Sequence, residues 1–196
     1  MTQPRQSERK ISPIFLERWS ARAFDETEVS ESVLQDLFEA ARWAPSAYNA
    51  QPWRFVYARR GTPYWKPFLD LLIPYNRDWA QHASALVFAF SERKFVAPGK
   101  TEAIETGFAS YDTGAAVAFL ALQASLSGLV AHIIAGFDGA AIVKKLEVPE
   151  GFKLESAIVI GRKGNPEKLP EALQAREFPG ERRPLPEFSA EGVFRF

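Results

Sequence analysis

The sequence has no cysteine and only two histidines, His82 and His132, among its 196 residues. The absence of cysteine excludes disulfide bonds, thiol nucleophiles, and zinc or iron-sulfur centres held by thiolates. The two histidines lie far apart in the sequence, so they do not form the closely spaced pair that a helical metal site uses. We therefore expect no metal site, and we expect both histidines to be structural or exposed.

Neither sign of charge is in excess, because Lys and Arg together number 24 and so do Asp and Glu. A chain without a net field is not drawn to nucleic acid or to an anionic membrane, so neither is expected as a partner. The segment Met1–Ser12 is polar and charged, and it lacks the apolar core of a secretory signal peptide. We expect a cytoplasmic protein.

The longest stretch without Lys, Arg, Asp or Glu runs from Thr113 to Phe137. Its length alone would suit a membrane span of about 20 residues. Ser127 followed by Gly128 is a typical helix end, however, and it leaves the continuous helix too short to span a bilayer. We predict a buried helix over Thr106–Ser127. Because this helix is apolar nearly all round, we expect it at the centre of the core or of a subunit interface.

The remaining pattern predicts one α+β domain over residues 1–196, with a large core because 46% of the residues are hydrophobic. Apolar spacing predicts a helix that starts at Ser30 or Ser32 and stops at Pro45. The charged segment Ser91–Gly99, which contains Pro98, is predicted as a loop. Short helices are predicted at Ile14–Leu16, Trp65–Leu72 and Ala140–Leu146, and strands at Phe55–Ala58, Leu86–Phe90, His132–Gly136 and Ser156–Gly161.

The chain after Gly161 changes to proline and charge and has little means of packing on itself. Its end is nevertheless apolar, with Phe188, Val193, Phe194 and Phe196. Apolar groups at the end of such a tail favour packing on another surface. We therefore predict an arm that wraps a second copy of the chain.

Two polar segments are unusual for pure scaffold. Arg18, Ser20 and Arg22 alternate, so an extended backbone would offer two guanidinium groups and a hydroxyl to one anion. The alternative is a solvated charged loop. The run Ala44–Trp53 joins a helix to a strand and carries closely spaced Ser, Asn and Gln, which suit the polar edge of a planar heterocycle. The alternative there is an ordinary turn.

Together the two segments resemble the signature of the FMN-dependent nitroreductase family. Arg-x-Ser-x-Arg-x-Phe at Arg18–Phe24 precedes Ala-Pro-Ser-x-x-Asn-x-Gln-Pro-Trp at Ala44–Trp53. The resemblance continues through Asn76, Asp112–Ala116, Gly128–Leu129, Gly136–Asp138 and Arg182–Leu185. It implies a three-layer α+β fold in which helices flank a central, mostly antiparallel sheet. It also implies a homodimer with shared active sites and a C-terminal arm exchanged between the subunits.

The resemblance implies roles for five residues near the flavin of one subunit. Arg18 and Ser20 would bind the phosphate and ribityl end of FMN, and Trp19 would add backbone contacts. Arg22 would stabilise the negative charge that develops at N1 and O2 when the flavin is reduced. Asn76 would hydrogen-bond the same edge of the ring.

Further implied cofactor contacts come from three other segments. The second subunit would contribute Pro45, Ser46, Ala47, Asn49 and Gln51. The backbone of Ile134, Ala135 and Gly136 would approach flavin N5, and Arg182 or Arg183 would complete the phosphate site. Two positions depart from some relatives, because Trp79 replaces a basic residue and Ala135 replaces a glutamate. The flavin potential and the substrate preference are therefore left open.

The implied function is an FMN-dependent NAD(P)H oxidoreductase that reduces nitroaromatics, quinones or similar small acceptors by a ping-pong mechanism. The flavin supplies the chemistry, so no catalytic side chain is named. The lack of a GxGxxG fingerprint agrees with a transiently bound NADH or NADPH. Two alternatives stay open. One is another flavin reaction on the same scaffold, such as flavin fragmentation, dehalogenation or azoline oxidation, and the other is a flavin-binding or sensing module without turnover.

Overall fold

The structure, a computed structural model, describes residues 5–196, so the first four residues of Met1–Ser12 lie outside it. A four-stranded sheet forms its centre, in the order β1 (Trp53–Arg59), β2 (Ala85–Glu92), β6 (Phe152–Gly161) and β5 (Val130–Ile134). Every neighbouring pair in it is antiparallel. Each of the four predicted strands is present.

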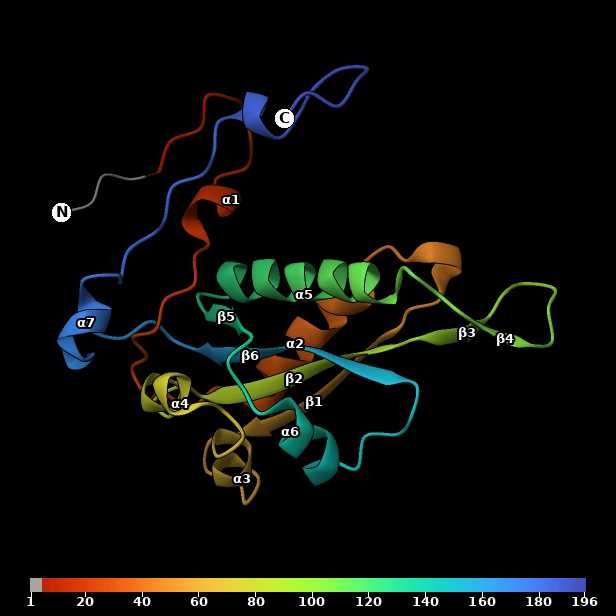
Figure 1. Cartoon of the computed structure of the whole chain (residues 1–196). Helices are drawn as coiled ribbons and strands as arrows, with labels where there is room; N and C mark the ends of the chain where they lie inside the picture. Colours follow the sequence, from red (N-terminus) through yellow and green to blue (C-terminus); the bar gives the residue numbers. More distant parts are fainter. Residues whose placement is uncertain (1–4) are drawn as a thin grey trace.

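Helices cover both faces of this sheet (Figure 1). On one face lie α2 (Glu31–Arg42) and α5 (Ala109–Leu126), whose buried residues join one core cluster. On the other face lie α3 (Trp65–Leu69), α4 (Pro74–Ala80) and α6 (Gly139–Lys145), whose buried residues join a second cluster. The predicted three-layer α+β arrangement is confirmed.

Strand β2 shows why this layering follows from the sequence. Successive side chains of a strand point to opposite faces of a sheet. Ala85, Val87 and Ala89 accordingly belong to the cluster under α2 and α5. Leu86, Phe88 and Phe90 belong to the cluster on the opposite face. The continuous apolar character of β2 therefore reflects a strand that is covered on both sides.

Two helix starts are capped by side chains. The hydroxyl of Ser30 accepts a hydrogen bond from the Val33 N–H at 3.3 Å, so α2 starts after Ser30 and not after Ser32. The carboxylate of Asp138 accepts from the Ala141 N–H at 2.9 Å and caps α6, as predicted. Each side chain satisfies an N–H that a helix start leaves without a partner.

One predicted loop is structured, and one helix was not predicted. Strands β3 (Lys94–Val96) and β4 (Ala103–Glu105) form a separate antiparallel hairpin, so the loop prediction for Ser91–Gly99 is wrong. Pro98 and Gly99 lie in the connection between these strands, where turn residues interrupt no pairing. Helix α4 begins with Pro74 at its first position, which suits proline because that N–H needs no partner.

Helix α5 is the longest helix, and Gly128 ends it with a positive φ of 70°, as predicted. Its small residues, such as Ala116 and Ala124, are fully buried against the sheet. Leu120 is also fully buried, but other large residues face outward, with Tyr111 80% exposed and Leu126 67% exposed. The single chain therefore does not bury this helix on every side, and its place at a subunit interface stays a prediction. Over residues 5–196, no helix is long and apolar enough to cross a membrane.

The two ends of the chain contribute shorter elements: α1 (Ile14–Glu17), α7 (Glu171–Gln174) and the 3-10 turns η2 (Pro166–Lys168) and η3 (Leu185–Glu187). A third 3-10 turn, η1 (Ala47–Asn49), follows α2. The N-terminal segment and the C-terminal tail extend past α1, away from the sheet (Figure 1). Every residue from 180 to 196 is exposed. Leu169 and Leu173, earlier in the tail, are buried in the core of their own chain. Only the last part of the predicted arm therefore stays exposed in the single chain.

Candidate functional site

Three arginines, Arg5, Arg18 and Arg182, lie near one another where the two ends of the chain come together. The Nη2 of Arg5 donates a hydrogen bond to the backbone carbonyl of Arg18 at 2.6 Å. Burial and then the charge of Arg182 lower the pKa of Arg18. Burial, Arg182 and Arg18 in turn lower the pKa of Arg5. Mutual repulsion of this kind favours an anion between the three side chains.

Of the two C-terminal arginines considered from the sequence, the structure brings Arg182 to this cluster. Arg183 faces Glu187 instead, with its Nε 4.0 Å from a carboxylate oxygen. Within residues 5–196, no ion pair joins Arg5, Arg18 or Arg182 to a carboxylate. The positive charge at this corner is therefore not neutralised by the chain itself.

The segment from Arg18 to Ala23 is extended and held by the tail. The backbone N–H groups of Arg22 and Ala23 both donate to the carboxylate of Glu177, at 2.8 and 2.9 Å. Ser20 and Trp19 are half-buried in the same segment. The ammonium of Lys163 lies over the Trp19 ring, 5.0 Å from its centre. The structure thus presents the predicted phosphate-binding segment as a fixed element.

The buried side chain of His132 contacts the backbone of this segment. Its Nδ1 lies 2.9 Å from the carbonyl oxygen of Ala21, which can only accept, so the Nδ1 carries the hydrogen. Burial lowers the pKa of His132 to about 4. The hydrogen bond to Ala21 raises this pKa, whereas the charges of Arg22 and Arg18 lower it further. His132 is therefore a neutral structural residue at pH 7, as its sequence context predicted.

Trp79 stacks on the ring of His132, with ring centres 4.8 Å apart, and also on Phe24 at 6.2 Å. It is 1% exposed. The residue that stands in place of a basic group is therefore part of the core beneath the Arg18–Ala23 segment.

Asn76 and Gly136 form the second part of the candidate site. The side-chain amide of Asn76 on α4 donates to the carbonyl oxygen of Gly136 at 3.0 Å. A β-carbon at position 136 would lie only 2.2 Å from the Asn76 Nδ2, so a larger residue there would displace the Asn76 side chain. In the same turn Ile134 is buried, whereas Ala135 is exposed. The turn that was predicted to approach a ring therefore offers its backbone at the surface.

The third part, the loop from Pro45 to Gln51, has an unusual backbone. Tyr48, Asn49 and Gln51 all have positive φ values, of 54°, 54° and 49°. Such strain persists only where surrounding contacts hold it, and it is typical of functional loops. Here the Ser46 hydroxyl accepts from the Gln51 N–H at 3.1 Å, while the buried carboxylate of Asp112 accepts from the Ala47 N–H at 3.0 Å. The loop is thereby tied to the first turn of α5.

We call the cluster of Arg5, Arg18 and Arg182 the arginine corner. This loop and the arginine corner lie at opposite ends of α5 in one chain (Figure 1). Asp112 holds the loop at the start of the helix. The arginine segment lies beside β5, which follows the end of the helix, through the contact between Ala21 and His132. Helix α5 has 18 residues, which corresponds to about 27 Å. One chain does not bring the predicted halves of the site together.

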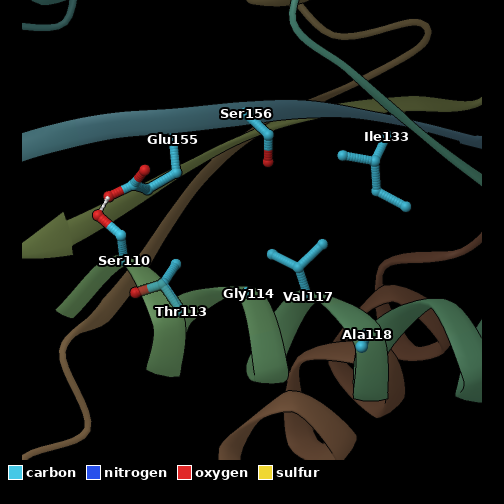
Figure 2. Close-up of a pocket in the computed structure, with 8 residues that line it drawn as sticks. All are labelled: Ser110, Thr113, Gly114, Val117, Ala118, Ile133, Glu155 and Ser156. Atoms are coloured by element: carbon cyan, nitrogen blue, oxygen red, sulfur yellow. Dashed lines mark hydrogen bonds between the residues drawn. The ribbon is translucent and has the colours of Figure 1, made fainter. Parts of the chain in front are cut away.

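A cavity of about 460 Å³ lies between α5 and the strands β5 and β6 (Figure 2). Its lining residues are Ser110, Thr113, Gly114, Val117, Ala118, Ile133, Glu155 and Ser156. Because Ile133 precedes the turn at Ile134–Gly136 directly, the cavity adjoins the second part of the site.

The polar end of this cavity is built around Glu155. Its carboxylate accepts hydrogen bonds from the hydroxyls of Ser110 and Ser91, both at 2.6 Å, and from the Lys153 ammonium at 2.9 Å. Burial by itself raises the pKa of Glu155, but these three donors outweigh it and hold the pKa below its usual value. The cavity is therefore apolar along most of its length and polar at one end, where Lys153 balances the charge of Glu155.

Three residues of this region carried no signal in the sequence. Arg5 is a single arginine in a charged N-terminal stretch, and Glu177 is one acid in a charged tail. Both act on Arg18–Ala23 only because the chain ends fold back on it. Glu155 lies where the pairing of β2 and β6 shifts between Ala89 and Phe90, an irregularity that sequence periodicity does not reveal.

Comparisons with known proteins agree on one family. The family model described as "Nitroreductase family" matches residues 15–162. A solved structure described as an oxidoreductase containing FMN has a TM-score of 0.94 and 42% identity, with 100% of this chain and 99% of that one covered.

Two further relatives are more distant. A Streptomyces coelicolor protein named "Putative NADH dehydrogenase/NAD(P)H nitroreductase" is 27% identical over 170 residues, which cover 78% of this chain and 83% of that protein. A nitroreductase family protein from Streptococcus pneumoniae shares the fold, with a TM-score of 0.72 at 20% identity and coverage of 91% and 98% of the two chains. Because the family model spans most of the sequence, this chain belongs to the nitroreductase family.

Proposed function

We propose that the protein is an FMN-dependent NAD(P)H oxidoreductase that works as a homodimer and reduces nitroaromatics, quinones or similar small acceptors. The observation that carries this proposal is the unneutralised cluster of Arg5, Arg18 and Arg182. A phosphate monoester carries close to two negative charges and three acceptor oxygens at neutral pH, which suits several guanidinium donors.

The residues at this corner fit FMN by a second test. The Nε of Arg5 is buried and has no hydrogen-bond partner among residues 5–196. A buried donor without a partner costs free energy, which a phosphate oxygen would recover. Arg18, Arg182 and Arg5 would therefore hold the phosphate, with Ser20 and the backbone of Trp19 beside the ribityl chain.

The ring end of the cofactor would lie between α4 and the turn after β5. Asn76 is held by Gly136, so its amide oxygen is left to accept from the ring edge. Arg22 would face the same edge and stabilise negative charge there, while the backbone of Ile134, Ala135 and Gly136 would approach N5. When bound, FMN would accept a hydride from NADH or NADPH and pass it to the acceptor in a ping-pong sequence.

The cavity beside Ile133 offers space for a planar apolar molecule next to that turn. Val117 and Ile133 supply apolar walls, and Glu155 lies at its polar end. This lining favours small, mostly apolar molecules such as aromatic ones. Phe108 and Tyr111 are exposed on α5 and are not among the cavity's lining residues.

The dimer is supported by what one chain leaves incomplete. The loop with Pro45, Ser46, Ala47, Asn49 and Gln51 lies about a helix length from the arginine corner, so a second copy would have to supply it. Large apolar groups on α5 are exposed in the single chain, as are those at the end of the tail: Phe108, Tyr111, Phe119, Leu126, Phe188, Val193, Phe194 and Phe196. Apolar surface on this scale is typical of an interface.

The test is to purify the protein, identify by chromatography what heat releases from it, and mix the anaerobic protein with NADH and NADPH in a stopped-flow spectrometer. We expect FMN, and bleaching of its absorbance by at least one donor. A protein that binds FMN but is bleached by neither donor would contradict the reductase and favour a binding module. Bleaching without transfer to nitroaromatics or quinones would favour another flavin reaction on this scaffold.

A further inference from the structure

Glu177 is a carboxylate from the C-terminal tail whose side chain is completely buried. One oxygen, Oε1, accepts from the backbone N–H groups of Arg22 and Ala23 at 2.8 and 2.9 Å. The other, Oε2, lies 3.8 Å from the Nη1 of Arg22. It is buried and has no hydrogen-bond partner among residues 5–196. A buried carboxylate is costly unless charge and hydrogen bonds offset it, and here Arg22 supplies the opposite charge.

A structural role alone does not require a charge at this position. A glutamine has the same shape, and its carbonyl oxygen could accept from the same two N–H groups. What glutamine lacks is the negative charge beside the guanidinium of Arg22. The negative charge of Glu177 therefore weakens the positive field of the Arg22 side chain. The hydrogen bonds that Glu177 accepts fix the backbone of Arg22.

We propose that Glu177 is a positioning residue that sets the reduction potential of the bound flavin by holding Arg22 and offsetting its charge. This inference rests on the proposed function, in which Arg22 faces the pyrimidine edge of FMN. A hydride brings two electrons and one proton, so it leaves one additional negative charge on the ring. An isolated cation at that edge stabilises this charge and raises the potential, and a neighbouring carboxylate weakens the effect.

The two buried side chains thus act as a pair with opposing effects. Arg22 alone would bind the reduced flavin much more tightly than the oxidised form. With Glu177 beside it, the preference is smaller and the reduced flavin gives up its electrons more readily. The C-terminal tail, which also carries Arg182, in this way supplies both a phosphate contact and the counter-charge of the ring site.

The test measures the flavin midpoint potential of the FMN-loaded parent, Glu177→Gln and Glu171→Gln by equilibration with a reference dye. Glu171 is exposed on α7 and gives the same change of charge in the same part of the tail. We expect a higher potential in Glu177→Gln, equivalent to about a tenfold tighter binding of reduced relative to oxidised FMN, or about 30 mV for a two-electron couple. Glu171→Gln should match the parent.

Two more variants separate charge from structure. Glu177→Asp keeps the charge and should keep the potential of the parent, although its shorter side chain lowers the melting temperature. Arg22→Gln should lower the potential, because the cation that stabilises the reduced ring is lost.

An unchanged or lower potential in FMN-loaded Glu177→Gln overturns the inference and leaves the proposed function standing. If Glu177→Gln does not hold FMN, the potential of Arg22→Gln becomes the test. An unchanged or higher potential in Arg22→Gln then overturns the inference. A parent protein that holds no FMN overturns both the inference and the proposed function.

Discussion

The side-chain amide of Asn76 donates a hydrogen bond to the carbonyl oxygen of Gly136 at 3.0 Å. This contact joins the helix α4 to the turn after β5, two segments on which the proposed ring site depends. Asn76 is buried, so its amide is fixed and its oxygen has a set direction. The absence of a side chain at Gly136 is what permits the approach.

Gly136→Ala should disrupt this contact. Its β-carbon would lie 2.2 Å from the Asn76 Nδ2 and 2.8 Å from the Ile73 Cδ1, so Asn76 has to move. We expect a loss of about 1–3 kcal/mol in unfolding free energy, together with weaker FMN binding. Urea titration and flavin fluorescence titration measure the two effects. Gly107→Ala is the control, because no atom lies within 4 Å of its added β-carbon. Equal behaviour of the two variants would contradict the assignment.

Arg182→Ala should weaken FMN binding more than Arg183→Ala does. The side chain of Arg182 belongs to the arginine corner, whereas Arg183 faces Glu187. A charge-assisted phosphate contact is worth about 1.5–3 kcal/mol, or roughly a ten- to hundredfold change in the dissociation constant. Equilibrium dialysis of the apoprotein against FMN measures it. If Arg183→Ala shows the larger loss, the phosphate contact has been given to the wrong arginine.

His132 should make the stability depend on pH between about 6.5 and 4. In the folded protein its pKa is about 4, below the ordinary 6.5, so the unfolded chain binds more protons in this range. The contribution is therefore full above pH 6.5 and is lost as the pH falls toward 4, by about 3 kcal/mol. Protonation would also place a third positive charge near Arg18 and Arg22.

The variant His132→Asn tests this pH dependence, because its amide can still donate to the Ala21 carbonyl but does not titrate. Denaturant titrations from pH 7 to pH 4 should show a flatter stability profile for His132→Asn than for the parent. His82→Asn, at a partly exposed site beside Glu26, should keep the steep profile. Parallel profiles for His132→Asn and the parent would show that His132 does not cause the pH dependence of the stability.

Removal of residues 189–196 should weaken the dimer without removing Arg182 or Glu177. This deletion takes away Val193, Phe194 and Phe196, which are exposed by 54%, 88% and 58% in the single chain. We expect a dimer dissociation constant at least tenfold higher in sedimentation equilibrium, because this apolar area is no longer buried. An unchanged constant would show that the end of the tail does not form part of the interface.

The sequence predicted the layers of the fold well because burial there follows from local pattern. Strand β2 is apolar on both faces, and Asp138 stands directly before an apolar helix, so periodicity and capping chemistry were sufficient. The same local reasoning predicted no helix directly after Leu72, although α4 begins at Pro74. It also failed at the hairpin of β3 and β4. These short strands are stabilised by their hydrogen bonds to each other, which the charged composition of the segment does not reveal.

The candidate site divides in a similar way. Arg18, Asn76 and Gly136 could be proposed from the sequence because they lie in motifs that resemble those of the family. Arg5 and Glu177 were not found, since their contacts to the Arg18–Ala23 segment depend on how both ends of the chain fold back. For α5 the sequence left the core and a subunit interface open as alternatives, because composition records apolar character and does not tell the two apart.

If each FMN site is built by two subunits, two differently defective chains should complement each other. One chain carries Arg18→Ala with Arg182→Ala, and the other carries Asn49→Gly with Gln51→Gly, which keep the positive φ values without strain. Each homodimer alone should bind FMN poorly.

In the mixed dimer, one site would receive the intact arginines of one chain and the intact loop of the other. We expect the purified mixed dimer to bind one FMN per two chains with the affinity of the parent. A mixed dimer that binds FMN no better than either variant alone would contradict a site shared between subunits.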